Sequence, residues 1–288
     1  MIEPASVPLS AATRVVGVIG DPVAHSLSPR LHNAAFRAMG LDWVSVGFRV
    51  DASSTAAAIA GAPALGIQGL SVTMPHKEAV ASLVACTPAA QRLASVNCVT
   101  FGPNGAEGDT TDGAGLLAAL FRQSGFVASG KRVFVVGTGG AARAITAAFG
   151  DAGAAEVLVL GRNADRVSRT AAMAGAVGRP ARTEEVTGCE LVVNATPIGM
   201  AGQPTDGTTW PVDPGLVTPD QLAVDLIYHP VRTPWLAALV DQGVPVMNGI
   251  GMLVHQAALA LERWTGEVVP VEAMWAAVAD PSDPGPSV

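Results

Sequence analysis

Short stretches rich in β-branched residues alternate along the chain with Ala- and Leu-rich stretches of helical length. The short stretches predict strands at residues 15–19, 67–73, 133–136, 157–160, 191–193 and 222–226. The longer stretches predict helices at residues 28–39, 113–123, 140–152, 233–242 and 252–264. The first helix carries local signals, with Ser28 as its N-cap, Pro29 in its first turn and Gly40 closing it. Strands that alternate with helices predict an α/β fold with largely parallel sheets.

A second fold start divides the chain. The strand before Gly137 runs directly into glycines, which is how a nucleotide-binding unit begins. We therefore predict two domains. One is a discontinuous α/β substrate-binding and catalytic domain, formed by residues 1–112 and completed by C-terminal helices in 249–288. The other is a Rossmann-type NADP-binding domain at 113–248. Residues 1–13 and 280–288 have little periodic apolar content and are expected to lie loose.

Composition narrows the chemistry. Charged residues make up only 14% of the 288 residues, and lysine occurs only at Lys77 and Lys131, so chemistry that needs an amine must use one of these two. The formal net charge of -7 and the absence of a Lys/Arg-rich run argue against a nucleic-acid partner. Cys86, Cys98 and Cys189 lie far apart without a C-x-x-C pair, so we expect buried thiols in a reducing compartment.

Membrane and metal signals are also missing. No apolar run approaches the roughly 18 residues of a membrane span, and the N-terminus has no signal-peptide pattern. The five histidines show no metal-ligand spacing, so no metal is expected. We expect most of them to be surface or hydrogen-bonded loop histidines, and the alternative for His76, beside Lys77, is that it lines the cleft. We expect a cytoplasmic protein, a monomer or a homodimer, with a small-molecule substrate.

The glycine turn matches G-x-G-x-x-G/A between a predicted strand and a predicted helix. Gly137 permits the tight turn, Gly139 lets the backbone approach a pyrophosphate, and the small Ala142 allows close helix packing. With Gly140 and Ala141, the turn leaves helix-terminal N–H groups to bind phosphate. The alternative is a tight strand-to-helix turn without a ligand.

The end of the next strand favours NADP over NAD. Arg162 and Asn163 follow this strand, and Arg166 lies four residues beyond Arg162. Guanidinium groups without a carboxylate at the strand end suit a 2′-phosphate. Because Asp165 lies nearby and exposed arginines are common, an ordinary helix surface is the alternative.

Lys77 and Asp112 are the candidates for proton transfer, because both lie where a loop leads into a predicted helix. A lysine hydrogen-bonded to an aspartate in a closed cleft can remove the proton of an alcohol during hydride transfer. A structural ion pair, or two solvated charges, is the alternative. The residues suited to hydrogen-bonding a polyhydroxylated acid are Ser26, Ser28, Thr73, Asn97, Tyr228 and Gln256. Ser28 could bind a carboxylate at its helix N-terminus or only cap the helix.

In order and spacing, these segments resemble the shikimate dehydrogenase family from about residue 14 to residue 277. The glycine turn is one of the shared motifs. The others are S-L-S-P at 26–29, V-T-M-P-H-K at 72–77, A-S-V-N at 94–97, D-T-T-D-G at 109–113, N-A-T-P-I-G-M at 194–200, D-L-I-Y-H-P at 225–230 and G-I-G-M-L-V-H-Q at 249–256.

The resemblance implies NADP-linked reduction of 3-dehydroshikimate to shikimate, a step in the synthesis of aromatic amino-acid precursors. It implies that Lys77 supplies the proton and Asp112 positions it, and that Ser26 and Ser28 hold the substrate carboxylate. The residues that would orient the ring are Thr73, Asn97, Tyr228 and Gln256. Those that would line the dinucleotide cleft are Asn194, Ala195 and Thr196, with Gly249 and Met252 at the nicotinamide.

The chain also departs from the family pattern. Only the arginine of the family's Asn-Arg-Thr element is kept, at Arg162, and Ser71 and Thr110 stand where the family most often has Asn, which we expect to tune the site rather than abolish it. Ser28 favours shikimate, since quinate-preferring relatives tend to have Thr there. The rival hypotheses are a quinate or aminoshikimate dehydrogenase and a catalytically silent dinucleotide-binding regulatory protein. A pure binder has no need of a proton donor such as Lys77.

Overall fold

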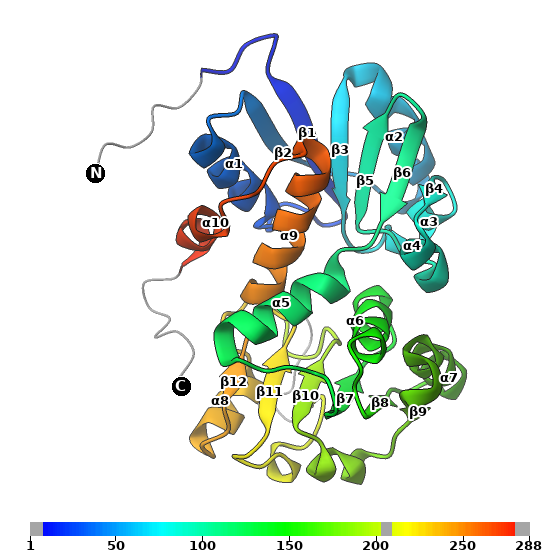
Figure 1. Cartoon of the computed structure of the whole chain (residues 1–288), viewed down its shortest axis with the longest axis vertical. Coiled ribbons are helices and arrows are strands. Elements are labelled where there is room, and N and C mark those ends of the chain that lie inside the picture. The colour runs from blue at the N-terminus through cyan, green and yellow to red at the C-terminus, as the bar shows by residue number, and fades with distance from the viewer. Residues whose placement is uncertain (1–7, 203–208, 280–288) are drawn as a thin grey trace. The chain divides into compact units, whose positions relative to one another are not determined.

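The chain forms two compact units in the computed structural model, which describes residues 8–202 and 209–279 (Figure 1). Among the described residues, unit 1 contains those up to Thr111 and those from Leu253 to Ala279, and unit 2 contains those between Asp112 and Met252. The chain therefore leaves unit 1 one residue earlier, and returns to it four residues later, than the boundaries expected from the sequence. The ends that we expected to be loose lie largely outside the described residues, namely 1–7 and 280–288.

Unit 1 is built on a six-stranded sheet in the order β2-β1-β3-β5-β6-β4. Its strands are β1 (Arg14–Gly20), β2 (Trp43–Arg49), β3 (Ile67–Val72), β4 (Ala85–Cys86), β5 (Cys98–Gly102) and β6 (Gly105–Asp109). Strand β1 is parallel to β2 and β3, but β5 is antiparallel to both β3 and β6. Three of the five pairings are parallel, since β4 is also parallel to β6, so the sheet is largely parallel as predicted. The antiparallel hairpin of β5 and β6 is the departure, because Pro103 and Asn104 alone connect these strands, and so short a loop joins only antiparallel strands.

Helices cover both faces of this sheet. They are α1 (Ser28–Met39), α2 (Thr55–Gly61), α3 (Lys77–Ala81), α4 (Pro88–Leu93), α9 (Ile250–Thr265) and α10 (Val271–Val278). Gly69 identifies the face that α9 covers, because a Cβ atom there would collide with the indole of Trp264. Since side chains alternate along a strand, Ser71 lies on the α9 face, while Leu70 and Val72 pack into the core on the side of α2 and α3 (Figure 1).

Unit 2 is built on a parallel sheet in the order β9-β8-β7-β10-β11-β12. Counted from β7 as the first strand, this is the 3-2-1-4-5-6 order of a dinucleotide-binding Rossmann fold. Its strands are β7 (Arg132–Val136), β8 (Glu156–Leu160), β9 (Gly178–Pro180), β10 (Leu191–Asn194), β11 (Leu222–Asp225) and β12 (Val246–Met247). Its helices are α5 (Asp112–Ser124), α6 (Gly140–Asp151), α7 (Ala164–Ala171) and α8 (Pro234–Asp241). Val133 and Val135 pack with α5 and α6, while Phe134 and Val136 pack with α8, so both faces of the sheet are buried.

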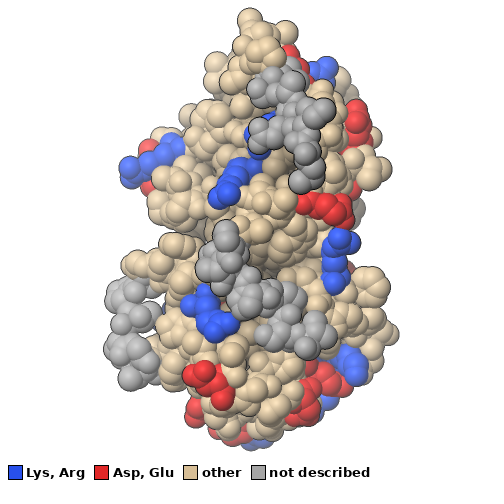
Figure 2. Space-filling model, turned by 90° about the vertical axis from the view of Figure 1, so that its left-hand side faces the viewer, with Lys and Arg blue, Asp and Glu red and all other residues tan. Residues whose placement is uncertain are grey.

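Every predicted strand and helix is present, with its ends shifted by at most two residues. Cys98 and Cys189 are buried, as expected, but Cys86 is only half-buried. Within the described ranges, no group of three or more His, Cys, Asp or Glu residues could hold a metal ion, and no helix is long and apolar enough to cross a membrane. On the face shown in Figure 2, charged side chains are scattered among uncharged ones.

Candidate active site

Gly137 and Gly139 serve different purposes in the glycine turn of unit 2. Gly137 has φ +127°, and a Cβ atom there would lie 2.8 Å from the carbonyl oxygen of Ala195. Gly139 is the N-cap of α6 without a side-chain hydrogen bond, and a Cβ atom there would meet nothing within 4 Å. Gly140 and Ala141 are the first two residues of α6, and the third, Ala142, is fully buried. The turn thus presents open backbone at Gly139 and at the start of a twelve-residue helix, which suits a phosphate group.

The loop after β10 lies next to this turn through Ala195, and Asn194 determines its shape. The fully buried Asn194 accepts hydrogen bonds through Oδ1 from the backbone N–H (3.0 Å) and the hydroxyl (2.7 Å) of Thr196, and its Nδ2 donates to Asp225 Oδ1 (3.0 Å). Asp225 also accepts a hydrogen bond from the Thr233 hydroxyl (2.8 Å), and burial raises the pKa of its carboxyl to about 6. Asn194 therefore shapes the loop that carries Ala195 and Thr196.

The residues after β8 are exposed beside the glycine turn. The side chain of Asn163 caps α7 by accepting the backbone N–H of Arg166 (2.9 Å), which occupies one acceptor of this side chain. The guanidinium of Arg166 donates to the carbonyl of Thr138 in the glycine turn (3.4 Å), so this cation lies at the turn. Arg162 is exposed at the end of the strand, and the nearest carboxylate in the sequence is Asp165 in the first turn of α7.

Gly249 and Met252 are set by packing within unit 2. A Cβ atom at Gly249 would collide with the carbonyl of Leu226, and Met252 packs into the core next to α5 and α6. Tyr228 follows β11 and is half-buried, and burial raises the pKa of its phenol. These positions allow no direct assignment to a ligand, so their roles stay predictions.

A buried hydrogen-bonded cluster in unit 1 joins two of the predicted substrate residues, Asn97 and Gln256. Asn97 Nδ2 donates to Gln256 Oε1 (3.2 Å) and to the hydroxyl of Thr111 (2.9 Å), while Asn97 Oδ1 accepts the backbone N–H of Thr111 (2.7 Å). The Thr111 hydroxyl donates in turn to the backbone carbonyl of Gln256 (3.0 Å). Thr111 is not among the predicted site residues, although it lies inside the D-T-T-D-G motif.

The hydroxyl groups expected to bind substrate lie at the carboxyl ends of β1 and β3. Helix α1 begins at Ser28, and its cap position falls on Leu27 without a side-chain hydrogen bond, so the predicted capping by Ser28 is wrong. Instead, Ser26 Oγ accepts the backbone N–H of Ser28 (3.3 Å). Two residues before Thr73, the buried Oγ of Ser71 has no hydrogen-bond partner among the described residues. Ser71 thus offers a hydroxyl to a ligand, and the only sign of this in the sequence is its departure from the family's Asn.

Lys77 is half-buried and begins α3. The neighbouring His76 is buried in the interior, where Nε2 donates to the carbonyl of Val50 (2.7 Å) and Nδ1 is hydrogen-bonded to the hydroxyl of Thr55 (2.9 Å). The alternative that His76 lines the cleft is therefore wrong. Lys131 lies 3.5 Å from Glu190 in a partly exposed ion pair at the start of β7. Of the two lysines, Lys77 is thus the candidate for catalysis.

Asp112 is buried as the first residue of α5. A Cβ atom at the following Gly113 would lie 2.7 Å from the carbonyl of Ala144 and 2.7 Å from the Cβ of Ala148, so α5 packs directly on α6. Since α6 starts at the glycine turn, this contact fixes Asp112 relative to the turn within unit 2.

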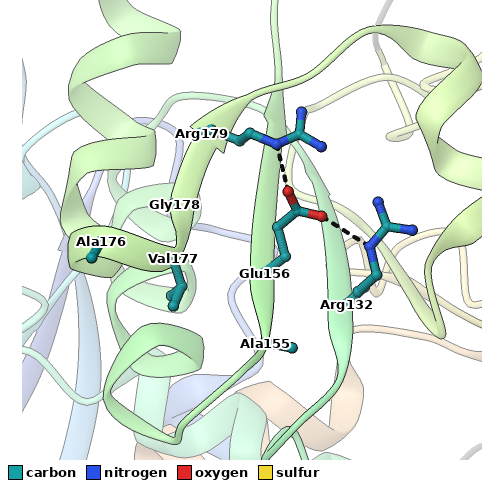
Figure 3. Close-up of a pocket in the computed structure, with 7 residues that line it drawn as sticks. All are labelled: Arg132, Ala155, Glu156, Ala176, Val177, Gly178 and Arg179. Atoms are coloured by element: carbon teal, nitrogen blue, oxygen red, sulfur yellow. Dashed lines mark hydrogen bonds and ion pairs between the residues drawn. The ribbon is translucent and has the colours of Figure 1, made fainter.

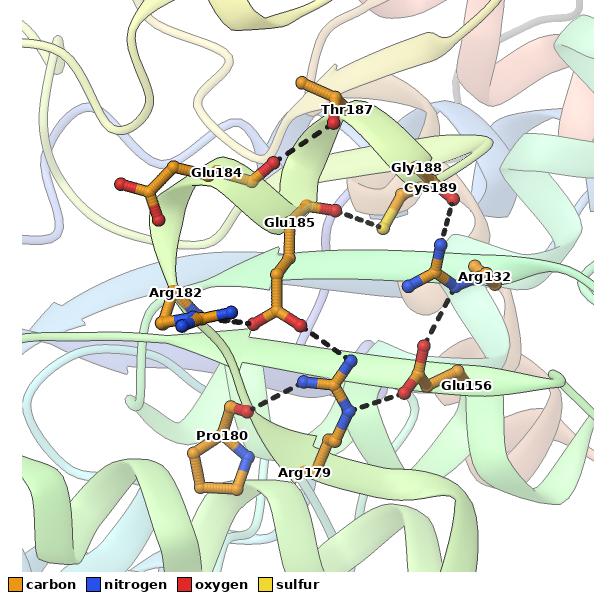
Figure 4. A network of polar contacts seen from close by, with 10 residues as sticks. All are labelled: Arg132, Glu156, Arg179, Pro180, Arg182, Glu184, Glu185, Thr187, Gly188 and Cys189. Atoms are coloured by element: carbon orange, nitrogen blue, oxygen red, sulfur yellow. Dashed lines mark hydrogen bonds and ion pairs between the residues drawn. The ribbon is translucent and has the colours of Figure 1, made fainter.

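A separate cavity lies at the amino ends of β7, β8 and β9 in unit 2. It measures about 350 Å³ and lies beside Glu156, which accepts from both Arg132 (2.9 Å) and Arg179 (2.5 Å) (Figure 3). Arg179 also pairs with Glu185 (2.8 Å) (Figure 4). This ion pair holds the pKa of the Arg179 guanidinium well above its usual range and lowers the pKa of the Glu185 carboxyl to about 2. Ligands of open α/β sheets bind at the carboxyl ends, and here the arginines already have partners, so this network is structural.

Comparison with known proteins identifies the family. The N-terminal substrate-binding domain of shikimate dehydrogenase matches residues 18–99, and the C-terminal domain of shikimate 5'-dehydrogenase matches residues 249–279. A shikimate dehydrogenase (NADP(+)) of Methanopyrus kandleri is 42% identical, covering 96% of this chain and 98% of that protein. The chain belongs to the shikimate dehydrogenase family. A second relative of the same name, from a Geobacter species, is 41% identical over 96% of this chain and 99% of its own length.

Solved structures of the shikimate dehydrogenase family share the fold. One shikimate dehydrogenase in complex with NADP+ has a TM-score of 0.87 at 33% identity and covers 95% of this chain and 97% of its own. The enzyme of Thermus thermophilus, in complex with NADP(H) and shikimate, has a TM-score of 0.84 at 32% identity, covering 92% and 98%. A quinate dehydrogenase of Corynebacterium glutamicum in complex with NAD has a TM-score of 0.82 at 27% identity, again covering 92% and 98%.

Proposed function

We propose that this protein is an NADP-dependent shikimate dehydrogenase that interconverts 3-dehydroshikimate and shikimate. The observation that carries the proposal is the 42% identity, over 96% of the chain, to a relative named for this reaction. Two features support it independently: the polar cluster in unit 1 and the glycine turn on the Rossmann sheet of unit 2. As part of the proposal, the enzyme works in the cytoplasm as a monomer or a homodimer.

The residues around the glycine turn fit a dinucleotide. Gly139 leaves its backbone open where a pyrophosphate would approach, and the first N–H groups of α6 would bind it. Arg162 and Arg166 would hold the 2′-phosphate, because one is exposed at the strand end and the other reaches the turn. Bound NADPH supplies the hydride for reduction, and NADP accepts it in the reverse direction.

The residues of unit 1 would hold the substrate. Ser26 and Ser28 would bind its carboxylate at the start of α1, while Thr73, Asn97 and Gln256 would orient its ring hydroxyls, with Tyr228 of unit 2 as a further hydroxyl donor.

Lys77 would donate a proton to the oxygen that becomes the alcohol of shikimate and would take it back in the oxidative direction. Asp112 would orient this ammonium group and stabilise its charge. A pocket with the same groups that also admits one more ring hydroxyl would accept quinate, which is the competing substrate.

The two lysines provide a matched experiment. Initial rates are measured with shikimate or quinate, each with NADP or NAD, for the wild type, Lys77→Ala and Lys131→Ala. We expect shikimate with NADP to give the highest kcat/KM. Loss of a positioned proton donor should lower the kcat of Lys77→Ala by about 10²- to 10⁴-fold, with NADP still bound. Lys131→Ala should keep wild-type kcat, since its ion pair lies at the start of β7, whereas the glycine turn follows the end of this strand.

Three outcomes would contradict the proposal. A higher kcat/KM with quinate or NAD would overturn the substrate or the cofactor assignment. Equal losses in both lysine variants would overturn the role of Lys77. A wild-type protein that binds NADP without turning over any of these substrates would support a regulatory protein instead.

A further inference from the structure

Thr111 occupies the centre of the buried cluster in unit 1, and only 2% of its surface is exposed. Thr111 makes two hydrogen bonds with Asn97, donating its backbone N–H and accepting through its hydroxyl oxygen. It donates its hydroxyl proton to the backbone carbonyl of Gln256. It therefore contacts both amide residues to which the proposed function assigns the substrate ring.

The direction of these hydrogen bonds sets how the Asn97 amide is turned. Asn97 Oδ1 accepts the backbone N–H of Thr111, so its NH₂ group must face the Thr111 hydroxyl and Gln256 Oε1. The hydroxyl accepts from this NH₂ group and donates to the Gln256 carbonyl, so it satisfies a donor and an acceptor at once. A methyl group in its place could do neither.

The same cluster includes the two points where the chain passes between the units. Thr111 is the last residue of unit 1 before the chain enters unit 2 at Asp112. Leu253 is the first residue after its return, and its carbonyl accepts Gln256 Nε2 (2.9 Å). The hydrogen bonds of Thr111 thus fix the backbone immediately before Asp112 together with the helix turn that carries Gln256.

We propose that Thr111 is a positioning residue of the active site, which orients the amides of Asn97 and Gln256 toward the substrate and fixes the backbone that leads to Asp112. This inference rests on the proposed function, because it assigns Thr111 no contact with substrate or cofactor. The hydroxyl is the group that matters, since the backbone N–H of any residue at this position could still hold Asn97 Oδ1.

The test compares Thr111→Val, which has a similar shape but no hydroxyl, with Thr111→Ser, which keeps the hydroxyl. Because two buried hydrogen bonds are lost, kcat/KM for shikimate should fall about ten-fold or more in Thr111→Val. Thr111→Ser should stay within about three-fold of the wild type, since one buried methyl group is lost. The Kd for NADP, measured by calorimetric titration, should be the same in all three proteins.

Thr146→Val is the matched control. Thr146 is fully buried in α6, and its hydroxyl has no hydrogen-bond partner among the described residues, so the same substitution there should leave kcat/KM unchanged. If Thr111→Val does not fold, Thr111→Ala replaces it, because it removes the hydroxyl without pressing a methyl group against the amide.

The inference is overturned if the variant without the hydroxyl keeps wild-type kcat/KM, if Thr111→Ser loses as much, or if NADP affinity falls in parallel with activity. A wild-type protein that is inactive on shikimate would overturn the proposed function and this inference together. A wild-type protein that is active, with an unaffected Thr111→Val, would overturn the inference alone.

Discussion

Replacing Gly137 and Gly139 by alanine, one at a time, separates a glycine required by the backbone from one required by the ligand. At Gly137, alanine would be strained by the backbone angle φ of +127°, and its Cβ atom would lie only 2.8 Å from the carbonyl oxygen of Ala195. Backbone strain of about 1–3 kcal/mol and overpacking of about 1–3 kcal/mol add to a loss of about 2–6 kcal/mol in folding stability. Gly137→Ala should therefore unfold at a clearly lower temperature, by about 4 °C or more.

Gly139→Ala should have the opposite profile. Gly139 has φ -79° and ψ -176°, which alanine adopts without strain, and its Cβ atom would meet nothing within 4 Å. Folding stability should change by less than about 1 kcal/mol. If this backbone approaches the pyrophosphate of NADP, however, the added methyl group pushes the pyrophosphate away and breaks a hydrogen bond between it and the backbone. Loss of one such bond, about 1.5–3 kcal/mol, weakens NADP binding roughly 10- to 100-fold.

Both quantities are measured on the same preparations, by thermal unfolding without cofactor and by calorimetric titration with NADP. Each half of the prediction has its own refutation. If Gly139→Ala binds NADP like the wild type, the pyrophosphate does not approach this turn. If Gly137→Ala unfolds at the wild-type temperature, the turn does not need the backbone conformation described here.

Two further predictions concern packing and pH. Gly69→Ala should push a methyl group into the indole of Trp264 and break the hydrogen bond from this indole to the Val99 carbonyl (3.1 Å), which should lower the free energy of unfolding in urea by about 2–5 kcal/mol. Gly47→Ala is the control and should be tolerated, because the nearest atom to its new Cβ would lie 3.8 Å away. Equal losses in the two variants would contradict this packing. Burial raises the pKa of Asp225 to about 6, so the folded state favours the protonated carboxyl. This preference contributes fully to the free energy of unfolding below the unfolded pKa near 3.8 and is lost as the pH rises through 6. The loss amounts to at most about 3 kcal/mol. The free energy of unfolding should therefore depend less on pH between 4 and 7 in Asp225→Asn than in the wild type, and identical pH profiles would refute the assignment.

The elements predicted from the sequence are mainly those whose strands are buried on both faces. Such strands show continuous apolar runs, as at residues 133–136 and 191–193, and the glycine turn marks where their helices begin. Edge and hairpin elements were not predicted, because their side chains face solvent on one side. Strand β6 contains two glycines and two acidic residues, and α7 is short and largely polar with Val167 as its one large apolar side chain, so neither contains an apolar run.

The site was only partly predictable for a different reason. Which polar groups pair depends on contacts between distant segments, such as the bond from Thr111 to Gln256 across 145 positions. No local pattern distinguishes a threonine that positions two amides from one that lies on the surface. Likewise, the sequence around Ser28 suits a helix cap, and only the position of Leu27 shows that the hydroxyl is not used for capping.

Buried hydroxyl groups without partners help to locate the substrate. Folded proteins satisfy nearly all buried polar groups, so an exception in a candidate site calls for a ligand. The Oγ of Ser71 is such an exception among the described residues, and it lies on the α9 face, two residues before Thr73 and on the side of the sheet where Trp264 packs. An unpaired hydroxyl alone would not suffice, since Thr146 has one within α6. Ser71 differs because it lies at the carboxyl end of a central strand, where a polyhydroxylated substrate could supply the missing hydrogen bond.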